Sequence, residues 1–196
     1  MSSEDFSSDD KPEFDNFADD YDAALMRGLR LTGESKDYFA GKRICLLAEK
    51  LQNLNVTTQT LLDFGCGTGS ATPFLRKHLN VTEITGIDPS EKSLEEARKT
   101  HGNGDAKFIN SEIFTAKSVC DLAYCNGVFH HIQTVDQITA ATQVFDSLKP
   151  GGYFSFWENN PWNPMTRFIM SRVAFDKDAK LIWPKNARMI LRSAGF

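Results

Sequence analysis

One stretch of the sequence combines residue types that bind nucleoside-like ligands. Residues 59–69 read Gln-Thr-Leu-Leu-Asp-Phe-Gly-Cys-Gly-Thr-Gly, so Asp63 precedes three glycines at alternate positions, Gly65, Gly67 and Gly69. Glycine reaches positive φ and has no Cβ, so this backbone can turn sharply and come close to a ligand. A helical pattern follows, and its unpaired N–H groups would point at the turn. The stretch predicts a nucleotide-sized pocket at the carboxyl end of a strand, with a carboxylate beside it.

The glycine spacing differs from the dinucleotide fingerprint, which is Gly-x-Gly-x-x-Gly. Here the third glycine comes one residue earlier, and Asp63 stands two residues before the first. A carboxylate at this place would repel a pyrophosphate and suits a cationic ligand without phosphate. Asp88 ends the next predicted strand and could accept hydrogen bonds from ribose hydroxyls, as it also could in an NAD site. The alternative for Asp88 is that it caps the following helix.

Strands and helices alternate along most of the chain. Strands are predicted at 58–64, 83–87, 106–109, 120–125 and 153–158, with a turn at 149–152. Helices are predicted at 36–54, 70–79, 91–100, 135–148, 165–173 and 185–193. Strands separated by helices of this length indicate βαβ units. The predicted fold class is therefore α/β, with a doubly wound, mostly parallel sheet in three layers whose ligands bind at the carboxyl ends of the strands.

The distribution of charge divides the chain into three parts. Residues 1–22 hold nine acidic residues and one lysine, although the net charge of the whole chain is only −4. Residues 1–13 are predicted to be an acidic, disordered tail. Residues 14–57 are predicted to form a helical lid and a first helix, and residues 58–196 the ligand-binding domain.

Composition narrows the class of protein. Apolar residues make up 41% and charged residues 24%, as in ordinary globular proteins. The four cysteines form no Cys-x-x-Cys pair, which predicts no metal site. No apolar run approaches the length that spans a bilayer, and the N-terminus lacks the apolar core of a signal peptide. We therefore expect a cytoplasmic protein without a membrane span and without a nucleic acid partner.

Four motifs together resemble the class I methyltransferases that use S-adenosylmethionine. They are Leu-Leu-Asp-Phe-Gly-Cys-Gly-Thr-Gly (61–69), Ile-Thr-Gly-Ile-Asp-Pro-Ser (84–90), Cys-Asp-Leu-Ala-Tyr-Cys-Asn-Gly-Val-Phe-His-His-Ile (120–132) and Leu-Lys-Pro-Gly-Gly (148–152). The resemblance implies a Rossmann-like domain with S-adenosyl-L-methionine as cofactor and S-adenosyl-L-homocysteine as product. Relatives usually continue into a sixth and seventh strand, so we expect the fold to be incomplete at its C-terminus. The exposed sheet edge could then form a homodimer.

The resemblance also implies which residues hold the cofactor. Asp63 and the backbone of Gly65 and Gly67 would hold the methionine end, Asp88 the ribose, and residues 111–113 the adenine. An aromatic residue of the N-terminal lid would cover the cofactor, and a ring face also attracts a sulfonium cation. The full set of expected cofactor residues is Tyr21, Asp63, Gly65, Cys66, Gly67, Asp88, Pro89, Ser111, Glu112, Ile113, Asn126 and Gly127.

The acceptor side is less well defined by the sequence. His131 is the candidate general base, because histidine titrates near neutral pH. The alternative is that His131 only packs at the start of a helix. The remaining substrate candidates are Phe17, Glu158, Asn160 and Trp162. For Phe17 and Trp162, structural roles in a helix stripe and in an anchored loop are equally consistent with the pattern.

The main hypothesis is a small-molecule methyltransferase that works by direct displacement. One alternative is an NAD(P)-binding oxidoreductase of the same layered fold. The carboxylate of Asp63 and the glycine spacing disfavour it. Another is a non-catalytic protein that retains the methyltransferase fold.

Overall fold

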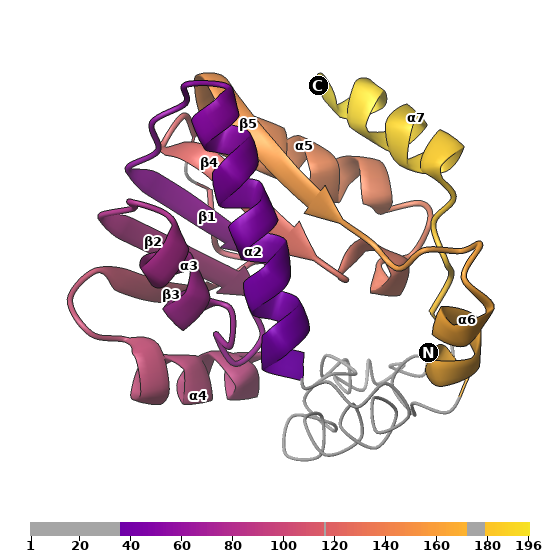
Figure 1. Ribbon diagram of the computed structural model, residues 1–196, viewed down its shortest axis with the longest axis horizontal. Helices are drawn as coiled ribbons and strands as arrows, with labels where there is room; N and C mark the ends of the chain where they lie inside the picture. The colour runs from indigo at the N-terminus through magenta and orange to yellow at the C-terminus, as the bar shows by residue number, and fades with distance from the viewer. Residues whose placement is uncertain (1–35, 116, 172–178) are drawn as a thin grey trace, which may run out of the picture.

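A five-stranded parallel sheet forms the centre of the protein, seen here in a computed structural model that describes residues 36–115, 117–171 and 179–196 (Figure 1). Phe17 and Tyr21 lie outside the described residues. The strands are β1 (Thr60–Phe64), β2 (Glu83–Asp88), β3 (Ala106–Asn110), β4 (Cys120–Asn126) and β5 (Leu148–Trp157). Their order in the sheet is β3-β2-β1-β4-β5, and all neighbouring pairs are parallel. The predicted α/β class and doubly wound sheet are confirmed.

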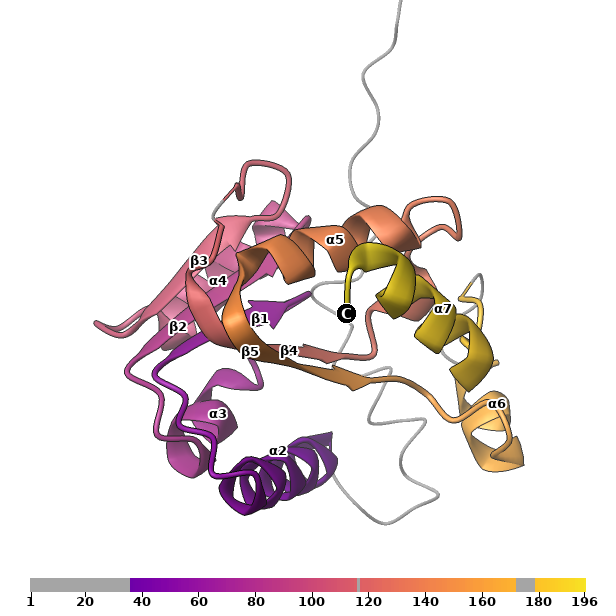
Figure 2. The same cartoon turned by 90° about the horizontal axis from the view of Figure 1, so that it is seen from above.

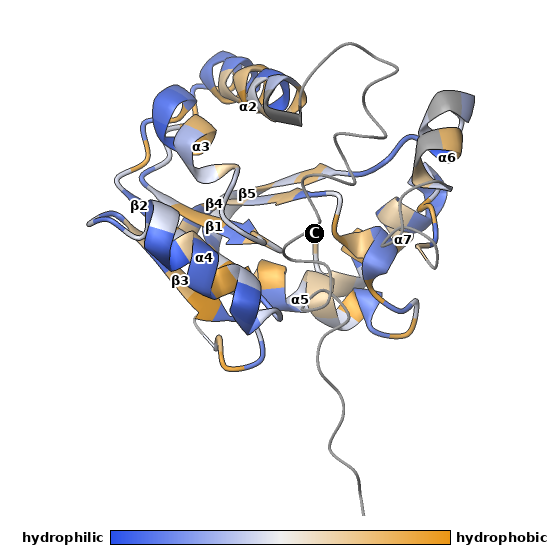
Figure 3. Cartoon of the chain, turned by 90° about the horizontal axis from the view of Figure 1, so that it is seen from below, coloured by the Kyte–Doolittle hydropathy of each residue, from blue (hydrophilic) through white to orange (hydrophobic). Residues whose placement is uncertain are grey.

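Helices cover both faces of this sheet, which gives the predicted three layers (Figure 2). The helices are α2 (Lys36–Asn53), α3 (Thr72–His78), α4 (Glu91–His101), α5 (Gln137–Ser147), α6 (Pro164–Met170) and α7 (Pro184–Ala194), with a short 3-10 helix η2 (Phe129–His131) after β4. Buried side chains of α2, α3 and α4 share one hydrophobic core, and those of α5 and α7 share a second core on the opposite face. Helices α4 and α5 are banded with hydrophobic and hydrophilic residues, as expected for helices that bury one side (Figure 3).

The order of the strands decides where a ligand can bind. Strand β1 lies between β2 and β4, so the connections leave it in opposite directions. The loops after β1 and β4 therefore separate, and a crevice forms at the carboxyl ends of these two strands. The glycine turn at 65–69 directly follows β1, which places it at this switch point.

Strand β5 begins earlier than predicted. The predicted turn at 149–152 falls within the strand, because Leu148 already pairs with Cys120. The register then shifts, so that the next paired residues are Leu122 and Tyr153. Gly151 has a φ of +81°. The Pro-Gly-Gly segment thus forms an irregularity inside the strand instead of a turn before it.

A charged cluster ties the amino ends of β1 and β4 together, on the side of the sheet away from the glycine turn. One carboxylate oxygen of Asp121 accepts hydrogen bonds from the backbone N–H groups of Gln59 and Thr60, each at 2.9 Å. The other oxygen lies 2.9 Å from Nζ of Lys149. Burial alone would raise the pKa of Asp121. The hydrogen bonds from Lys149, Thr60 and Gln59 outweigh this effect and hold the pKa well below its usual range.

The contacts of Asp121 predict that removing its charge lowers the stability of the folded protein. Because the folded pKa is lowered, the contribution of Asp121 is present above its unfolded pKa and disappears as the pH falls through the folded value. We expect Asp121→Asn to lower the unfolding free energy at pH 7 by about 2 kcal/mol, the range for hydrogen bonds to a charged group. Urea denaturation at pH 7 and pH 3 measures this, and exposed Glu95→Gln on α4 is the control. An equal loss at both pH values would contradict the assignment.

Among the described residues, no helix is long and apolar enough to cross a lipid bilayer.

Candidate functional site

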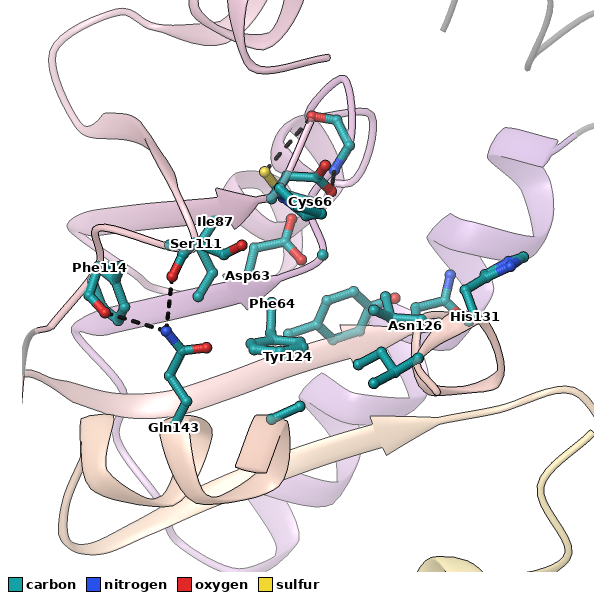
Figure 4. Close-up of a pocket in the computed structure, with 18 of the residues that line it drawn as sticks. Asp63, Phe64, Cys66, Ile87, Ser111, Phe114, Tyr124, Asn126, His131 and Gln143 are labelled. Carbon is teal, nitrogen blue, oxygen red and sulfur yellow. Dashed lines mark hydrogen bonds between the residues drawn. The ribbon is translucent and has the colours of Figure 1, made fainter. Parts of the chain in front are cut away.

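A cavity of about 1070 Å³ opens at the carboxyl ends of β1, β2 and β4 (Figure 4). The glycine turn, the loop after β3, the loop after β4 and one side of α5 line it. In Figure 4, Asp63 and Cys66 lie together at one part of the cavity, and Asn126 and His131 lie together at another. The cavity therefore brings three of the four sequence motifs to one place.

Positive backbone torsions shape the turn after β1. Gly65, Gly67 and Gly69 have φ values of +71°, +51° and +74°, which L-residues with side chains rarely adopt. A Cβ on Gly65 would lie 2.7 Å from Cγ1 of Val128, so Val128 packs directly on this glycine. No atom of the described residues outside its chain neighbours lies within 4 Å of a Cβ built on Gly67, and Gly67 lines the cavity. Gly67 thus leaves room for a ligand against the backbone.

The N–H groups of the first two glycines already have partners in the protein. Gly65 donates to the carbonyl of Ile87 at 2.8 Å, and Gly67 donates to Oδ2 of Asp88 at 2.9 Å. A ligand at these glycines could therefore come close to the backbone, but it would find no free N–H donor on Gly65 or Gly67. The same bonds join the end of β1 to the end of β2.

Asp63 is the most unusual side chain of the cavity. It is only 3% exposed, and its Oδ2 atom is buried without a hydrogen-bond partner among the described residues. Burial, and to a lesser extent the charge of Asp88, raise its pKa to about 7. A buried carboxylate oxygen without a partner is unfavourable, and a cationic ligand would satisfy it.

Two other buried groups adjoin Asp63. Tyr124 lies opposite Asp63 in the sheet register and is 1% exposed, and its hydroxyl has no hydrogen-bond partner within the described structure. Burial and the charge of Asp63 raise the pKa of Tyr124. Burial likewise raises the pKa of Cys66, with the charges of Asp63 and Asp88 adding to the effect. Both groups therefore stay neutral near pH 7, and Cys66 is a poor nucleophile.

Asp88 anchors the turn and the next helix at once. Its Oδ1 accepts a hydrogen bond from the N–H of Ser90, and its Oδ2 accepts the one from Gly67, each at 2.9 Å. The N-cap of α4 is Ser90, whose hydroxyl accepts a hydrogen bond from the N–H of Ser93. The capping alternative for Asp88 is therefore wrong.

The loop after β3 is held by a side chain that the sequence did not suggest. Nε2 of Gln143 on α5 donates to the carbonyls of Ser111 and Phe114, at 3.0 and 3.2 Å. The N–H of Ser111 donates to the carbonyl of Asp88, and the N–H of Glu112 donates to Oδ1 of Asn110. The backbone N–H groups here therefore have internal partners, and the Ser111 and Phe114 side chains are left to line the cavity.

Glu158 holds the loop after β4. Its Oε1 accepts hydrogen bonds from the N–H groups of Val128 and Phe129 at 3.2 and 2.8 Å, and its Oε2 lies 2.6 Å from Nδ1 of His130. The side chains of Glu158 and His130 are 8% and 3% exposed. The rings of His130 and His131 lie 4.1 Å apart between centroids, and His131 lines the cavity. Glu158 thus fixes the backbone next to the cavity from outside it.

Replacing Glu158 tests this structural role. We expect Glu158→Gln to lower the unfolding free energy by about 2 kcal/mol, because two backbone N–H groups lose a charged acceptor and the ring of His130 loses a charged partner in a buried place. Urea denaturation measures the loss, with exposed Glu112→Gln as the control. A change below about 0.5 kcal/mol, typical of surface substitutions, would mean that the buried contacts do not support the loop.

The structure brings most of the expected site residues to the cavity. The expected residues that line it are Asp63, Gly65, Cys66, Gly67, Asp88, Pro89, Ser111, Asn126, Gly127 and His131. Five others lie outside its lining, namely Glu112, Ile113, Glu158, Asn160 and Trp162. Ile113 is 72% exposed and Trp162 is 65% exposed, with its ring against Trp183. The described residues contain no group of His, Cys, Asp and Glu side chains arranged to hold a metal ion.

Comparison with known proteins agrees with this geometry. Residues 62–154, which include the last three residues of β1, all of β4 and the residues that line the cavity, match a family model described as a methyltransferase domain. This segment is therefore similar to methyltransferase domains, and the order of the strands is that of the Rossmann-like methyltransferase fold. A trans-aconitate 2-methyltransferase of Agrobacterium fabrum is 35% identical over 92 residues, which are 46% of this chain and 34% of that protein. A trans-aconitate 2-methyltransferase of Escherichia coli O1:K1 is 26% identical over 144 residues, 72% of this chain and 56% of that protein.

A solved structure supports the same fold over most of the chain. It is the methyltransferase in a Haloferax volcanii complex with the Trm112 methyltransferase activator, which is 21% identical and superposes with a TM-score of 0.67. The match covers 93% of this chain and 76% of that one. In contrast, the chain spans only about a third to somewhat more than half of the curated relatives just described.

Proposed function

We propose that this chain transfers a methyl group from S-adenosylmethionine to a small-molecule acceptor by direct displacement, with S-adenosylhomocysteine as product. The observation that carries the proposal is the buried carboxylate of Asp63, a residue that lines a cavity beside a glycine turn and whose Oδ2 has no hydrogen-bond partner among the described residues. S-Adenosylmethionine has a cationic amino group and sulfonium and no phosphate, so it fits this carboxylate. An NAD pyrophosphate does not fit it.

The described residues fit separate parts of this cofactor. Asp63 would hold the cationic methionine end, and Gly65 and Gly67 would let it approach the backbone. Asp88 would accept hydrogen bonds from the ribose hydroxyls, and Pro89 and Ser111 would flank the adenine. Asn126 and Gly127 would lie near the sulfonium. Phe17 and Tyr21 remain candidates for a covering lid.

When bound, S-adenosylmethionine supplies an electrophilic methyl group on a sulfonium. The task of the chain is then to align the acceptor with the S–CH₃ bond and to exclude water, and such positioning is worth about 7–11 kcal/mol. The leaving thioether is neutral, so no general acid is needed there. His131 lines the cavity and is the candidate base for an acceptor that arrives protonated.

Isothermal titration calorimetry tests the cofactor assignment. We expect saturable binding of S-adenosylhomocysteine and no binding of NAD(H). Binding of NAD(H) alone would support the oxidoreductase alternative. Binding of neither would support a non-catalytic protein. Transfer of radiolabel from S-adenosylmethionine to a mixture of small molecules then tests the reaction, and trans-aconitate belongs in that mixture because of the names of the two relatives.

Two further parts of the proposal concern the setting of the protein. We place it in the cytoplasm, in keeping with four cysteines that are all free thiols. We also propose that the outer edge of β5, which has no partner strand in the described sheet, is where two copies could meet. Light scattering after size-exclusion chromatography measures whether a dimer forms.

A further inference from the structure

The side chain of Gln143 links α5 to the loop after β3 and keeps one polar atom for another partner. Its Nε2 donates to the carbonyls of Ser111 and Phe114, at 3.0 and 3.2 Å. A carbonyl oxygen only accepts hydrogen bonds, so the amide nitrogen faces the loop and the amide oxygen faces away from it. No described residue donates a hydrogen bond to that oxygen, Oε1. The amide therefore presents an acceptor in a fixed orientation.

This acceptor belongs to the lining of the cavity. Gln143, Ser111 and Phe114 all line it, and Gln143 is only partly buried. In Figure 4 the amide of Gln143 reaches from α5 to the loop beside Ser111 and Phe114, with its nitrogen toward the loop and its oxygen away from it. Ile87 and Phe114 add apolar surface to the lining. An apolar surface with one fixed acceptor suits a flat heterocycle that carries an N–H donor.

The loop after β3 has already used the groups that could otherwise bind such a heterocycle. The N–H of Ser111 donates to the carbonyl of Asp88 at 3.0 Å. The N–H groups of Glu112 and Ile113 donate to the side chain and to the carbonyl of Asn110. Glu112, the acid of this loop, also lies outside the cavity lining. The amide oxygen on α5 can therefore take the role that an acid in the loop would have.

On the basis of the proposed function, we propose that Gln143 sets the base specificity of the cofactor site, because its Oε1 accepts a hydrogen bond from the exocyclic 6-amino group of adenine. Hypoxanthine and guanine present a carbonyl oxygen at position 6, and that oxygen would face Oε1 with no donor between them. Turning the amide to offer its nitrogen would break both bonds to the loop. Those two bonds thus hold the amide in the orientation that selects adenine.

Three homocysteine nucleosides that differ at position 6 of the purine test this assignment. They are S-adenosylhomocysteine, its analogue with hydrogen in place of the amino group, and S-inosylhomocysteine, which has a carbonyl there. In calorimetry on the wild-type protein, the hydrogen analogue should bind about 3- to 10-fold more weakly than S-adenosylhomocysteine, as expected for the loss of one neutral hydrogen bond. S-Inosylhomocysteine should bind more weakly still. Equal affinity for the first two ligands overturns the proposal.

A pair of variants separates contact with the base from support of the loop. Gln143→Met keeps the length of the side chain and removes both polar atoms, so the preference for the amino group should disappear. Asn110→Ala also removes two hydrogen bonds of this loop, to the N–H of Glu112 and to the carbonyl of Pro89, and Asn110 lies outside the cavity lining. It should weaken the three ligands by a similar factor and keep the preference. A preference that survives in Gln143→Met, or that Asn110→Ala also abolishes, contradicts a direct contact.

Binding of S-adenosylhomocysteine to the wild-type protein separates this proposal from the proposed function. If S-adenosylhomocysteine binds and the preference is absent, the assignment of Gln143 is wrong and the cofactor site stands. If none of the three ligands binds, the proposed function is wrong, and the assignment of Gln143 is wrong with it.

Discussion

Asp63→Asn is expected to weaken cofactor binding strongly while making the empty protein more stable above pH 7. The carboxylate is buried, its Oδ2 has no partner among the described residues, and it faces the proposed cationic end of the ligand. Removing one partner of a buried charge pair costs about 3–5 kcal/mol. The Kd for S-adenosylhomocysteine should therefore rise at least about 100-fold, as measured by calorimetry.

The stability of the empty protein should change in the opposite direction. Burial raises the pKa of Asp63 from 3.8 to about 7. Because the folded pKa is above the unfolded one, the protonated acid favours the folded state, and this stabilisation is lost as the pH rises through about 7. The unfolding free energy of the wild type should thus fall relative to Asp63→Asn between pH 5 and 8, by an amount on the order of a few kcal/mol.

Ligand binding should also release a proton. A cation beside Asp63 lowers its pKa, so a protein that is half protonated at pH 7 loses about half a proton per ligand bound. Calorimetry in buffers with different ionisation enthalpies measures this number. Glu95→Asn on the exposed side of α4 is the control. Normal ligand affinity in Asp63→Asn would contradict the assignment of this carboxylate to the cofactor.

Gly65→Ala is expected to be the most destabilising single-methyl change in the glycine turn. Its φ of +71° costs an L-residue about 1–2 kcal/mol. The new Cβ would also lie 2.7 Å from Cγ1 of Val128 and closer still to Cγ2. Overpacking of this kind typically costs about 1–3 kcal/mol, so we expect a total loss of about 3 kcal/mol in urea denaturation.

Two further variants separate the causes of that loss. Gly65→Ala with Val128→Ala removes the overlap but keeps the backbone strain, so it should recover part of the stability. Gly67→Ala has a φ of +51° and open space around its Cβ, so it should cost only about 1 kcal/mol. However, Gly67→Ala should weaken cofactor binding because Gly67 lines the cavity. Equal stability losses at both glycines would mean that the contact with Val128 is not a constraint.

The parts of the site that the sequence predicted are those carried by local chemistry. Asp63, the glycine turn and Asp88 follow from residue types at short spacing, and the alternation of elements predicts the order of the layers. The roles of Gln143 and Val128 were not predicted, because each acts on a segment far away in the sequence. Gln143 holds the loop after β3 from α5, and only the packing of the layers brings them together.

The predictions were weakest in the loops, where the sequence does not show which side chains point into the cavity. Residues 111–113 were all expected at the adenine, but the turn after β3 places only Ser111 in the cavity lining and leaves Ile113 exposed. Glu158 was expected to face the acceptor because it follows β5, yet its carboxylate accepts hydrogen bonds from η2 and the residue before it. An acid at a strand end can serve a ligand or the backbone, and residue type alone does not separate the two.

The contact between Gly65 and Val128 has a consequence for how such sequences diverge. Position 65 is restricted twice, by its torsion and by the overlap, whereas position 128 is restricted only by the overlap. The two positions should therefore tolerate substitution to different extents during evolution. We expect homologues to keep glycine at 65 while position 128 varies among small and branched residues, and a side chain at 65 to arise only after 128 has become alanine or glycine. The order of those two substitutions in a lineage would then be fixed by packing.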